Sequence, residues 1–385
     1  MEMKYVEDPK LNEKVAEIIE ELKNEIISHF HPKSIILSGS FGRGEATVIE
    51  ENGKLNFLSD CEILLVPYKW IFSRKKLDEF EQNFYRRTGL KVEIWGLFPC
   101  ALTRAKPTIA NYDLKHGSKI LYGKNYLEKI PDFKPEDIPL WEGIRLMLNR
   151  MAEALEYFSL ENPTTEMIFW TDKIVIACQD ALLLSIGKYH PLLRKRSDLF
   201  VEYSSIFRKI HPKILEIVRR AVKRKLSGKT DHCYIDEAIS YWYETSEIAD
   251  KVFRYLIKKY WGIEFRDYLD FHTKYLKKVM RPFLAPQNFI KYLKLLMLYK
   301  LNNPLPLKSL KSRAPFEHLI YSIIPLAYFD LCGKSDVSEK HLNCVHKVLA
   351  YFGVNYEPNP RKCVKEIVRL WKIIFAPIKM REARP

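Results

Sequence analysis

The chain has 385 residues, of which 47% are hydrophobic, and a formal net charge of +15. This is enough apolar material for a large core and predicts two or three domains. Seven cysteines without a CxxC pair argue against a disulfide framework or a zinc site. Residues 319–331 are apolar but too short to span a bilayer, and no stretch resembles a signal peptide. We therefore expect a cytoplasmic protein with reduced thiols and no membrane partner.

The first 135 residues begin with a helix and continue with short strands. Apolar residues recur at helical spacing between Leu11 and Ile26. Short apolar runs, separated by Gly and Pro, follow at residues 34–38, 61–66, 91–97 and 118–122. This pattern predicts an α/β or α+β domain.

The first of these strands ends in a turn of small residues, Ser38-Gly-Ser-Phe-Gly-Arg-Gly44. Its glycines allow a phosphate group to approach the main chain, so Gly39, Ser40 and the N–H groups of residues 39–44 form a candidate phosphate cradle. Arg43 is the nearest cation for such a phosphate. The alternative is an Arg43 that faces solvent or pairs with Glu45.

Residues 47–57 set two alternating arms around Asn52-Gly53. This dipeptide is the strongest short-range hairpin signal, because both central residues of a type I′ turn need positive φ. A hairpin here returns the chain to the small-residue turn. It brings Ser59 and Asp60 beside Gly39 and Ser40.

Asp60 and Glu62 enter the next strand, where side chains two residues apart share a face. Two unpaired negative charges repel each other, whereas divalent cations with hard oxygen ligands stabilise such a pair. This arrangement is typical of metal-assisted phosphoryl or nucleotidyl transfer. The alternative for an Asp-x-Glu pair is an exposed strand face.

Glu93 is a carboxylate amid the apolar residues of Lys91-Val-Glu-Ile-Trp95. Burying it is costly unless it binds a cation, finds a basic partner or is protonated. An edge strand that faces water is the other alternative. If this strand pairs beside residues 60–66, Glu93 completes a second metal site or acts as the base that deprotonates an acceptor hydroxyl.

From residue 136 the hydrophobic period is helical, and prolines at 131, 135 and 139 mark the junction. A second junction is expected at residues 281–286. We predict domains at 1–135, 136–281 and 282–385, of which the last two are mainly α-helical. Helices are expected at residues 142–159, 166–187, 212–226, 235–261, 265–280, 288–301, 316–331, 337–352 and 361–375.

The positive charge belongs to the helical part. Residues 1–135 contain 21 basic and 20 acidic side chains, while residues 136–385 contain 42 and 28. Clusters such as Arg194-Lys-Arg196, and Arg219-Arg220 with Lys223-Arg224-Lys225, are expected to attract phosphate groups or nucleic acid over long range. A solvated helical face explains any one cluster equally well.

The three acidic residues and the turn resemble the nucleotidyltransferase superfamily that shares its catalytic domain with DNA polymerase beta. The matching segments are 38–44, 59–63 and 92–94, in that family's order. The resemblance covers roughly the first 125 residues. Two differences are a longer gap between Ser40 and Asp60, which the hairpin explains as an insertion, and Glu instead of Asp at position 62.

This resemblance implies an α+β fold with a small mixed sheet, two Mg²⁺ ions, and transfer of a nucleoside monophosphate from a nucleoside triphosphate with release of pyrophosphate. By it, Gly39 and Ser40 contact the triphosphate, Asp60 and Glu62 bind the metals, and Glu93 is the third carboxylate. Residues 172–189 resemble the helix that small members of the superfamily set across the nucleotide cleft. Lys173 and Asp180 then approach the nucleotide or the acceptor; the alternative is a surface lysine and a polar bundle residue.

Three functions remain open at this stage. The favoured one is a Mg²⁺-dependent nucleotidyltransferase that modifies a hydroxyl of a small molecule or a protein. In the second, the basic helical part binds RNA, and the aromatic and basic residues of 255–261 suit stacking on bases. In the third, the protein is a non-catalytic nucleotide-binding or regulatory module.

Overall fold

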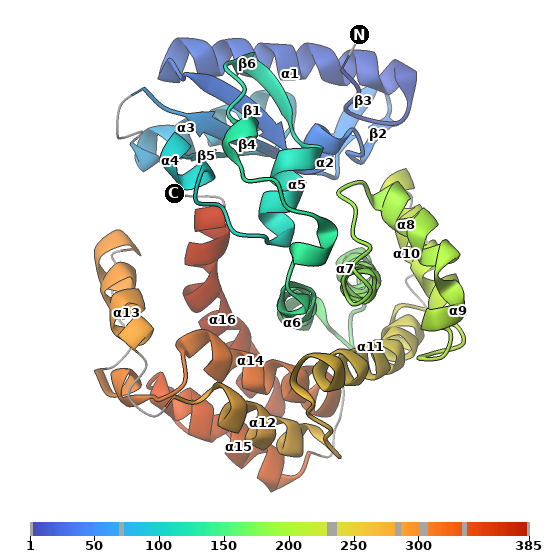
Figure 1. Cartoon of the computed structure of the whole chain (residues 1–385), viewed down its shortest axis with the longest axis vertical. Helices are drawn as coiled ribbons and strands as arrows, with labels where there is room; N and C mark the ends of the chain where they lie inside the picture. Colours follow the sequence, from blue (N-terminus) through green and yellow to red (C-terminus); the bar gives the residue numbers. More distant parts are fainter. Residues whose placement is uncertain are drawn as a thin grey trace.

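The computed structural model describes residues 3–68, 73–228, 237–281, 286–299, 307–332 and 337–382. The sheet and the helices around it form one end of the molecule, and the helices that follow in the chain form the other end (Figure 1). The described residues are therefore mixed α+β, with a small sheet and a helical C-terminal region, as predicted.

Four strands form a mixed sheet in the order β5-β4-β1-β6. At its centre, β1 (Ser34–Ser38) is antiparallel to β4 (Cys61–Val66). On the edges, β6 (Lys119–Gly123) is antiparallel to β1, and β5 (Val92–Gly96) is parallel to β4. The four strand predictions are confirmed to within one residue at each end.

The predicted hairpin is present as β2 (Val48–Glu51) and β3 (Lys54–Phe57). Asn52 and Gly53 have φ angles of 51° and 76°, as a type I′ turn requires. At the base of the hairpin, the Thr47 N–H donates to Ser59 Oγ at 2.9 Å. The hairpin is therefore closed at its base, and the chain continues directly to Asp60.

The two faces of the sheet pack against different cores. Odd-numbered residues of β1 and β4 pack against α1 (Pro9–Phe30) and α3 (Arg74–Thr88). Even-numbered residues, namely Ile36, Leu64 and Val66, belong to a second cluster that includes Leu184 and Tyr189 from the helical part. Because side chains alternate along a strand, the even face is the one turned toward the helical part.

Short helices complete the N-terminal part. On the even face lie α4 (Pro99–Leu102) and α5 (Ile109–Gly117), which supply Leu102 and Tyr112 to the second cluster. A five-residue helix, α2 (Gly39–Arg43), follows β1 directly. Residues 39–43, predicted as a turn, thus form a short helix, and α3, α4 and α5 lie between residues 66 and 118, where no helix was predicted.

In the helical part, α6 (Leu140–Tyr157) and α7 (Thr165–Leu184) pack along each other. A Cβ built on Gly143 would lie 2.8 Å from Ala181 Cα, so the two backbones approach closely there. The remaining helical elements are η1 (Leu127–Lys129), η2 (Pro135–Asp137), α8 (Leu193–Glu202), α9 (Ser204–Phe207), α10 (Ile214–Ser227), α11 (Ala238–Trp261), α12 (Tyr268–Val279), α13 (Pro286–Tyr299), η4 (Leu307–Lys311), α14 (Phe316–Leu326), the π-helical turn η5 (Ala327–Leu331), α15 (Glu339–Tyr351) and α16 (Pro360–Glu382).

Each of the nine predicted helical ranges contains a helix, whereas α8 and α9 were not predicted. Residues 235, 236, 300 and 301 of those ranges lie outside the described residues. The division into three domains stays a prediction. No described helix is long and apolar enough to cross a membrane.

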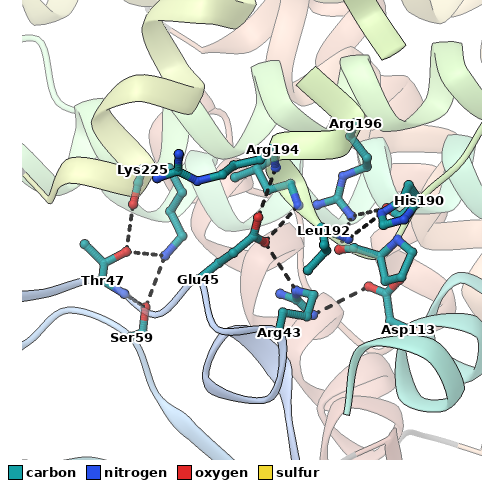
Figure 2. Close-up of polar contacts among 12 residues, drawn as sticks. Arg43, Glu45, Thr47, Ser59, Asp113, His190, Leu192, Arg194, Arg196 and Lys225 are labelled. Atoms are coloured by element: carbon teal, nitrogen blue, oxygen red, sulfur yellow. Dashed lines mark hydrogen bonds and ion pairs between the residues drawn. The ribbon is translucent and has the colours of Figure 1, made fainter. Parts of the chain in front are cut away.

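Polar contacts join the two parts directly after α2 (Figure 2). The buried Glu45 carboxylate accepts hydrogen bonds from the N–H groups of Leu193, at 2.8 Å, and Arg194, at 3.0 Å. It thereby satisfies two donors at the N-terminus of α8, where a negative charge is favoured. The Thr47 hydroxyl donates to the Lys225 carbonyl at 2.7 Å. The segment between α2 and β2 is thus held against α8 and α10.

Candidate functional site

Three carboxylates project from the even face of the sheet. Asp60 directly precedes β4, and Glu62 is the second residue of that strand. In the strand register Glu62 lies opposite Ser38 of β1 on one side and opposite Glu93 of β5 on the other. Side chains of paired residues share a face, so the structure brings the three predicted carboxylates together on the side that faces the helical part.

Glu62 is the most enclosed of the three. A Cβ built on Gly39 would lie 2.6 Å from Glu62 Cδ, and the φ of Gly39 is +64°. Glycine is therefore required at the first residue of α2 both by backbone conformation and by the nearness of the carboxylate. Burial raises the pKa of Glu62, Arg43 opposes this shift, and Glu93 and Asp60 add to it. An added cation would favour the ionised form.

Lys91 lies between the other two carboxylates. Its Nζ is 2.9 Å from Asp60 Oδ2 and 2.9 Å from Glu93 Oε1. Although partial burial lowers the pKa of Lys91, its hydrogen bonds to Asp60 and Glu93 raise that pKa above the usual value. The sequence left open whether Glu93 binds a cation, pairs with a basic residue, is protonated or faces water. In the structure Glu93 pairs with Lys91, and its side chain is 41% exposed.

The donor set suits a hard divalent cation. Among the described residues, no group of three or more His, Cys, Asp or Glu side chains already has the spacing of a metal site. Asp60 and Glu93 nevertheless share one cation, the Lys91 ammonium, and the ionised form of Glu62 is disfavoured by burial first and by the nearby carboxylates second. Carboxylate oxygens are the ligands that Mg²⁺ prefers. Asp60, Glu62 and Glu93 are thus the residues that would hold it.

The predicted phosphate cradle is the α2 turn. Gly44, the residue that caps the C-terminus of α2, has a φ of +74°, and a Cβ on Gly42 would lie 2.5 Å from the Leu37 carbonyl oxygen. The Ser40 carbonyl accepts from the Glu45 N–H at 2.9 Å, while the Ser40 hydroxyl has no hydrogen bond to any described residue. Ser40 is half-buried, so this hydroxyl is an available donor.

Arg43 faces two acids on the far side of the turn. Its Nε is 3.9 Å from Glu45 Oε2, and its Nη1 is 3.7 Å from Asp113 Oδ2 (Figure 2). The predicted alternative of a pair with Glu45 is therefore present. Both distances exceed a hydrogen bond, and Arg43 Nε is buried with no hydrogen-bond partner among the described residues.

Lys173 and Asp180 of α7 point to different partners. Lys173 Nζ lies 4.0 Å from the Trp170 ring centroid and 4.4 Å from that of Phe169. It makes no ion pair with any described residue. Burial lowers the pKa of Lys173 well below its usual value, Arg150 and Lys225 lower it further, and Asp60 opposes them. An anion near this ammonium would stabilise its charged form.

Asp180 instead is buried and pairs with Arg196 Nε at 2.8 Å. Burial raises the pKa of Asp180 to about 6, although Arg196 opposes the shift. This carboxylate supports the interior of the helical part. It is not brought to the acidic row.

Two further cations lie at the site. Arg150 was not predicted, and Lys225 was expected only as part of a basic cluster that attracts phosphate. Arg150 of α6 is influenced by Glu62, and Lys225 of α10 by Asp60. Lys225 Nζ also donates to Thr47 Oγ1 at 3.3 Å and to Ser59 Oγ at 3.4 Å, beside Asp60 (Figure 2). Burial lowers the pKa of both side chains, that of Lys225 to about 8. Helical spacing alone does not mark either residue, because each reaches the sheet only through the packing of its helix.

The site therefore combines two opposite groups of charge. The acidic row, which we define as Asp60, Glu62 and Glu93, projects from the sheet. The cation group, which we define as Arg43, Arg150, Lys173 and Lys225, comes from α2, α6, α7 and α10. Each member of this group interacts electrostatically with Glu62 or with Asp60 of the acidic row. Such a pairing can bind a polyphosphate together with a cation that neutralises it.

No protein-family model and no curated protein matches this sequence. The functional assignment therefore depends on the geometry of these residues.

Substitution of Gly39 tests how closely the turn and the acidic row approach. We expect Gly39→Ala to lower the free energy of unfolding by about 2–4 kcal/mol, because it adds a positive-φ penalty and a contact with Glu62. Gly53→Ala is the matched control: its φ is +76°, but no heavy atom lies within 4 Å of the added Cβ. It should cost only about 1 kcal/mol.

Urea denaturation measures both variants. Glu62→Ala in the Gly39→Ala background should recover the part of the loss that exceeds the control. An equal loss for Gly39→Ala and Gly53→Ala would contradict the close approach of Gly39 and Glu62.

Proposed function

We propose that the protein is a Mg²⁺-dependent nucleotidyltransferase, with a polymerase-beta-like N-terminal domain, that transfers a nucleoside monophosphate from a nucleoside triphosphate to a hydroxyl group. The observation that carries this proposal is the acidic row on one face of the sheet, with the cation group opposite it. Neither group is explained by stability alone, because like charges gathered at one site oppose folding.

The turn and the cation group supply the contacts for a triphosphate. The Ser40 hydroxyl is an available donor, and Gly39 leaves no side chain between the turn and Glu62. Lys173 and Lys225 are cations whose charged forms are disfavoured in the protein alone. A bound polyanion would favour the charged forms of Lys173 and Lys225, and this attraction would add to its affinity.

Asp60, Glu62 and Glu93 would hold the Mg²⁺ ions, which neutralise developing charge on the phosphates and activate the acceptor oxygen. Lys91 occupies the space between Asp60 and Glu93 in the protein alone. It therefore competes with a metal for those two carboxylates. Glu93, whose side chain is 41% exposed, is also within reach of solvent as the base for an acceptor hydroxyl.

A small-molecule or protein acceptor is favoured over RNA. The segment 255–261 was the main support for base stacking, and its Trp261 packs inside the helical part, 5.1 Å from the ring of Trp141 and 5.2 Å from that of Tyr275. Trp261 is thereby engaged within the protein. Tyr260 of the same segment is 42% exposed, so RNA stays an alternative, as does a non-catalytic role.

Asp60→Asn tests the assignment of the acidic row. Because the amide keeps the shape and removes the charge, we expect about a thousandfold loss of pyrophosphate release with Mg²⁺, labelled nucleoside triphosphates and cell extract as the acceptor source. Mn²⁺ affinity, measured by electron paramagnetic resonance, should fall with it. Asp132→Asn is the control, since that carboxylate is 87% exposed and pairs only with Lys115 among the described residues. Unchanged Mn²⁺ binding in Asp60→Asn would refute the metal assignment.

The pKa of Lys225, lowered by burial to about 8, predicts a pH dependence of nucleotide binding. Arg43 and Arg150 favour the neutral amine, whereas Asp60 and Glu45 favour the ammonium. The charged form attracts phosphate and is lost as the pH rises through about 8. Affinity for a nonhydrolysable ATP analogue with Mg²⁺ should therefore fall up to about tenfold between pH 7 and pH 9.

Isothermal titration of Lys225→Arg provides the comparison, because arginine stays charged over this range. This variant should lose most of the pH dependence, and Lys223→Arg, at an exposed position on the same helix, should keep it. A pH dependence that is the same in both variants would show that Lys225 does not contact the phosphates.

A further inference from the structure

A pocket of about 490 Å³ lies on the other side of the α2 turn from the acidic row. It is lined by the ends of α2 and α5, the start of β6 and the loop at residues 190–192. In the sheet, β6 pairs with the edge of β1 that faces away from β4. The pocket and the acidic row are thus separated by β1 and α2. Its size is in the range of small-molecule sites.

The lining residues carry nitrogen donors and no carboxylate. They are Gly42, Arg43, Tyr112, His116, Gly117, Ser118, Lys119, His190, Pro191 and Leu192. The acids nearest to Arg43, Glu45 and Asp113, are not among them. The excess of donors predicts an anionic ligand.

In the described part of the chain, the charge of Lys119 is not neutralised locally, whereas the charge of Arg43 is met by Glu45 and Asp113. Lys119 Nζ donates to the Lys4 carbonyl and lies 5.5 Å from the Tyr5 ring centroid, and it has no carboxylate partner among the described residues. Burial lowers the pKa of Lys119, and Lys4 lowers it further. An anion in the pocket would favour the charged form of Lys119.

His190 presents a donor to the same space. Its Nδ1 accepts from the Leu192 N–H at 3.0 Å, so the neutral ring carries its proton on Nε2. Figure 2 shows His190 beside Arg43 and Asp113 at the junction of the two parts. His116 adds a second imidazole, which lies against Tyr112 with ring centroids 4.5 Å apart and ring planes tilted by 50°.

Two buried polar atoms of the lining residues lack partners. Arg43 Nε and Ser118 Oγ are both buried and make no hydrogen bond to any described residue. Such atoms are rarely left unpaired in folded proteins, because each costs free energy that a bound ligand can recover. Tyr112, Pro191 and Leu192 give the pocket an apolar wall as well.

We propose that this pocket binds a small molecule in which a phosphate monoester is attached to an apolar or ring-shaped body. Lys119, His116 and His190 bind the phosphate, and Tyr112, Pro191 and Leu192 pack against the body. This site is distinct from the acidic row and requires no divalent cation. Its occupant would contact both the N-terminal part and the loop that leads into α8.

Isothermal titration of the full chain in EDTA tests the proposal with AMP, inorganic phosphate and adenosine as probes. EDTA removes any binding that depends on a divalent cation at the acidic row. Because the cation group can still attract phosphate, binding is assigned to the pocket by its loss in the variants below. We expect AMP to bind more tightly than inorganic phosphate, and adenosine not to bind. His116→Ala with Lys119→Met should weaken AMP binding by about tenfold or more, because two donors are removed.

Lys124→Met is the control for loss of one charge, since Lys124 is exposed just beyond β6 and does not line the pocket. Because His116 is exposed, His116→Ala can also be made alone if the double variant does not fold. Thermal melts verify the fold of each variant. Full AMP affinity in the double variant, equal binding of adenosine and AMP, or no AMP binding at millimolar concentration would each overturn the proposal.

Discussion

The strand register that sets Ser38, Glu62 and Glu93 side by side is the constraint on which the site depends. Parallel pairing of β4 with β5 puts two glutamates opposite each other, and Asp60 continues the same row. Like charges directly across a sheet are destabilising. The protein offsets this cost locally with the Lys91 ammonium, held between Asp60 and Glu93. The three carboxylates are therefore held side by side by the buried core beneath the strands, because they do not attract one another.

The helical part completes the site by bringing cations to it. Arg150, Lys173 and Lys225 lie on three helices of one hydrophobic core, and each is buried enough that its charged form is disfavoured. The Glu45 carboxylate at the N-terminus of α8 and the Thr47 contact with α10 hold this part against the sheet. Some of the charges at the site are already paired: Lys91 lies between Asp60 and Glu93, and Arg43 faces Glu45 and Asp113. Arg150 pairs with Glu153 of its own helix.

Local sequence patterns were sufficient for much of this architecture. The Asn52-Gly53 turn, the strand positions and the shared face of Asp60 and Glu62 follow from backbone preferences and the two-residue period of strands. The glycine at position 39 was visible in the sequence, and its positive φ in the structure explains why a glycine is needed there.

The missed features depend on contacts between distant segments. Lys91 is adjacent to a predicted carboxylate strand, but only the pairing of β4 with β5 shows that it bridges two acids. Lys225 contacts Ser59, from which it is separated by 166 positions in the sequence. Asp180 was expected near the nucleotide because it shares a helical face with Lys173, yet its pairing with Arg196 of α8 draws it into the interior. Neither partner helix could be oriented from periodicity alone.

The most direct test of the account is a crystal structure with Mn²⁺ and a nonhydrolysable ATP analogue, in which anomalous scattering locates the metal. The account predicts a Mn²⁺ peak bounded by Asp60 and Glu62, with Glu93 beside it, the triphosphate against the α2 turn, and Lys91 Nζ displaced from between its two carboxylates. A nucleotide bound elsewhere, or one bound with Lys91 still bridging Asp60 and Glu93 and no metal peak at the acidic row, would contradict it.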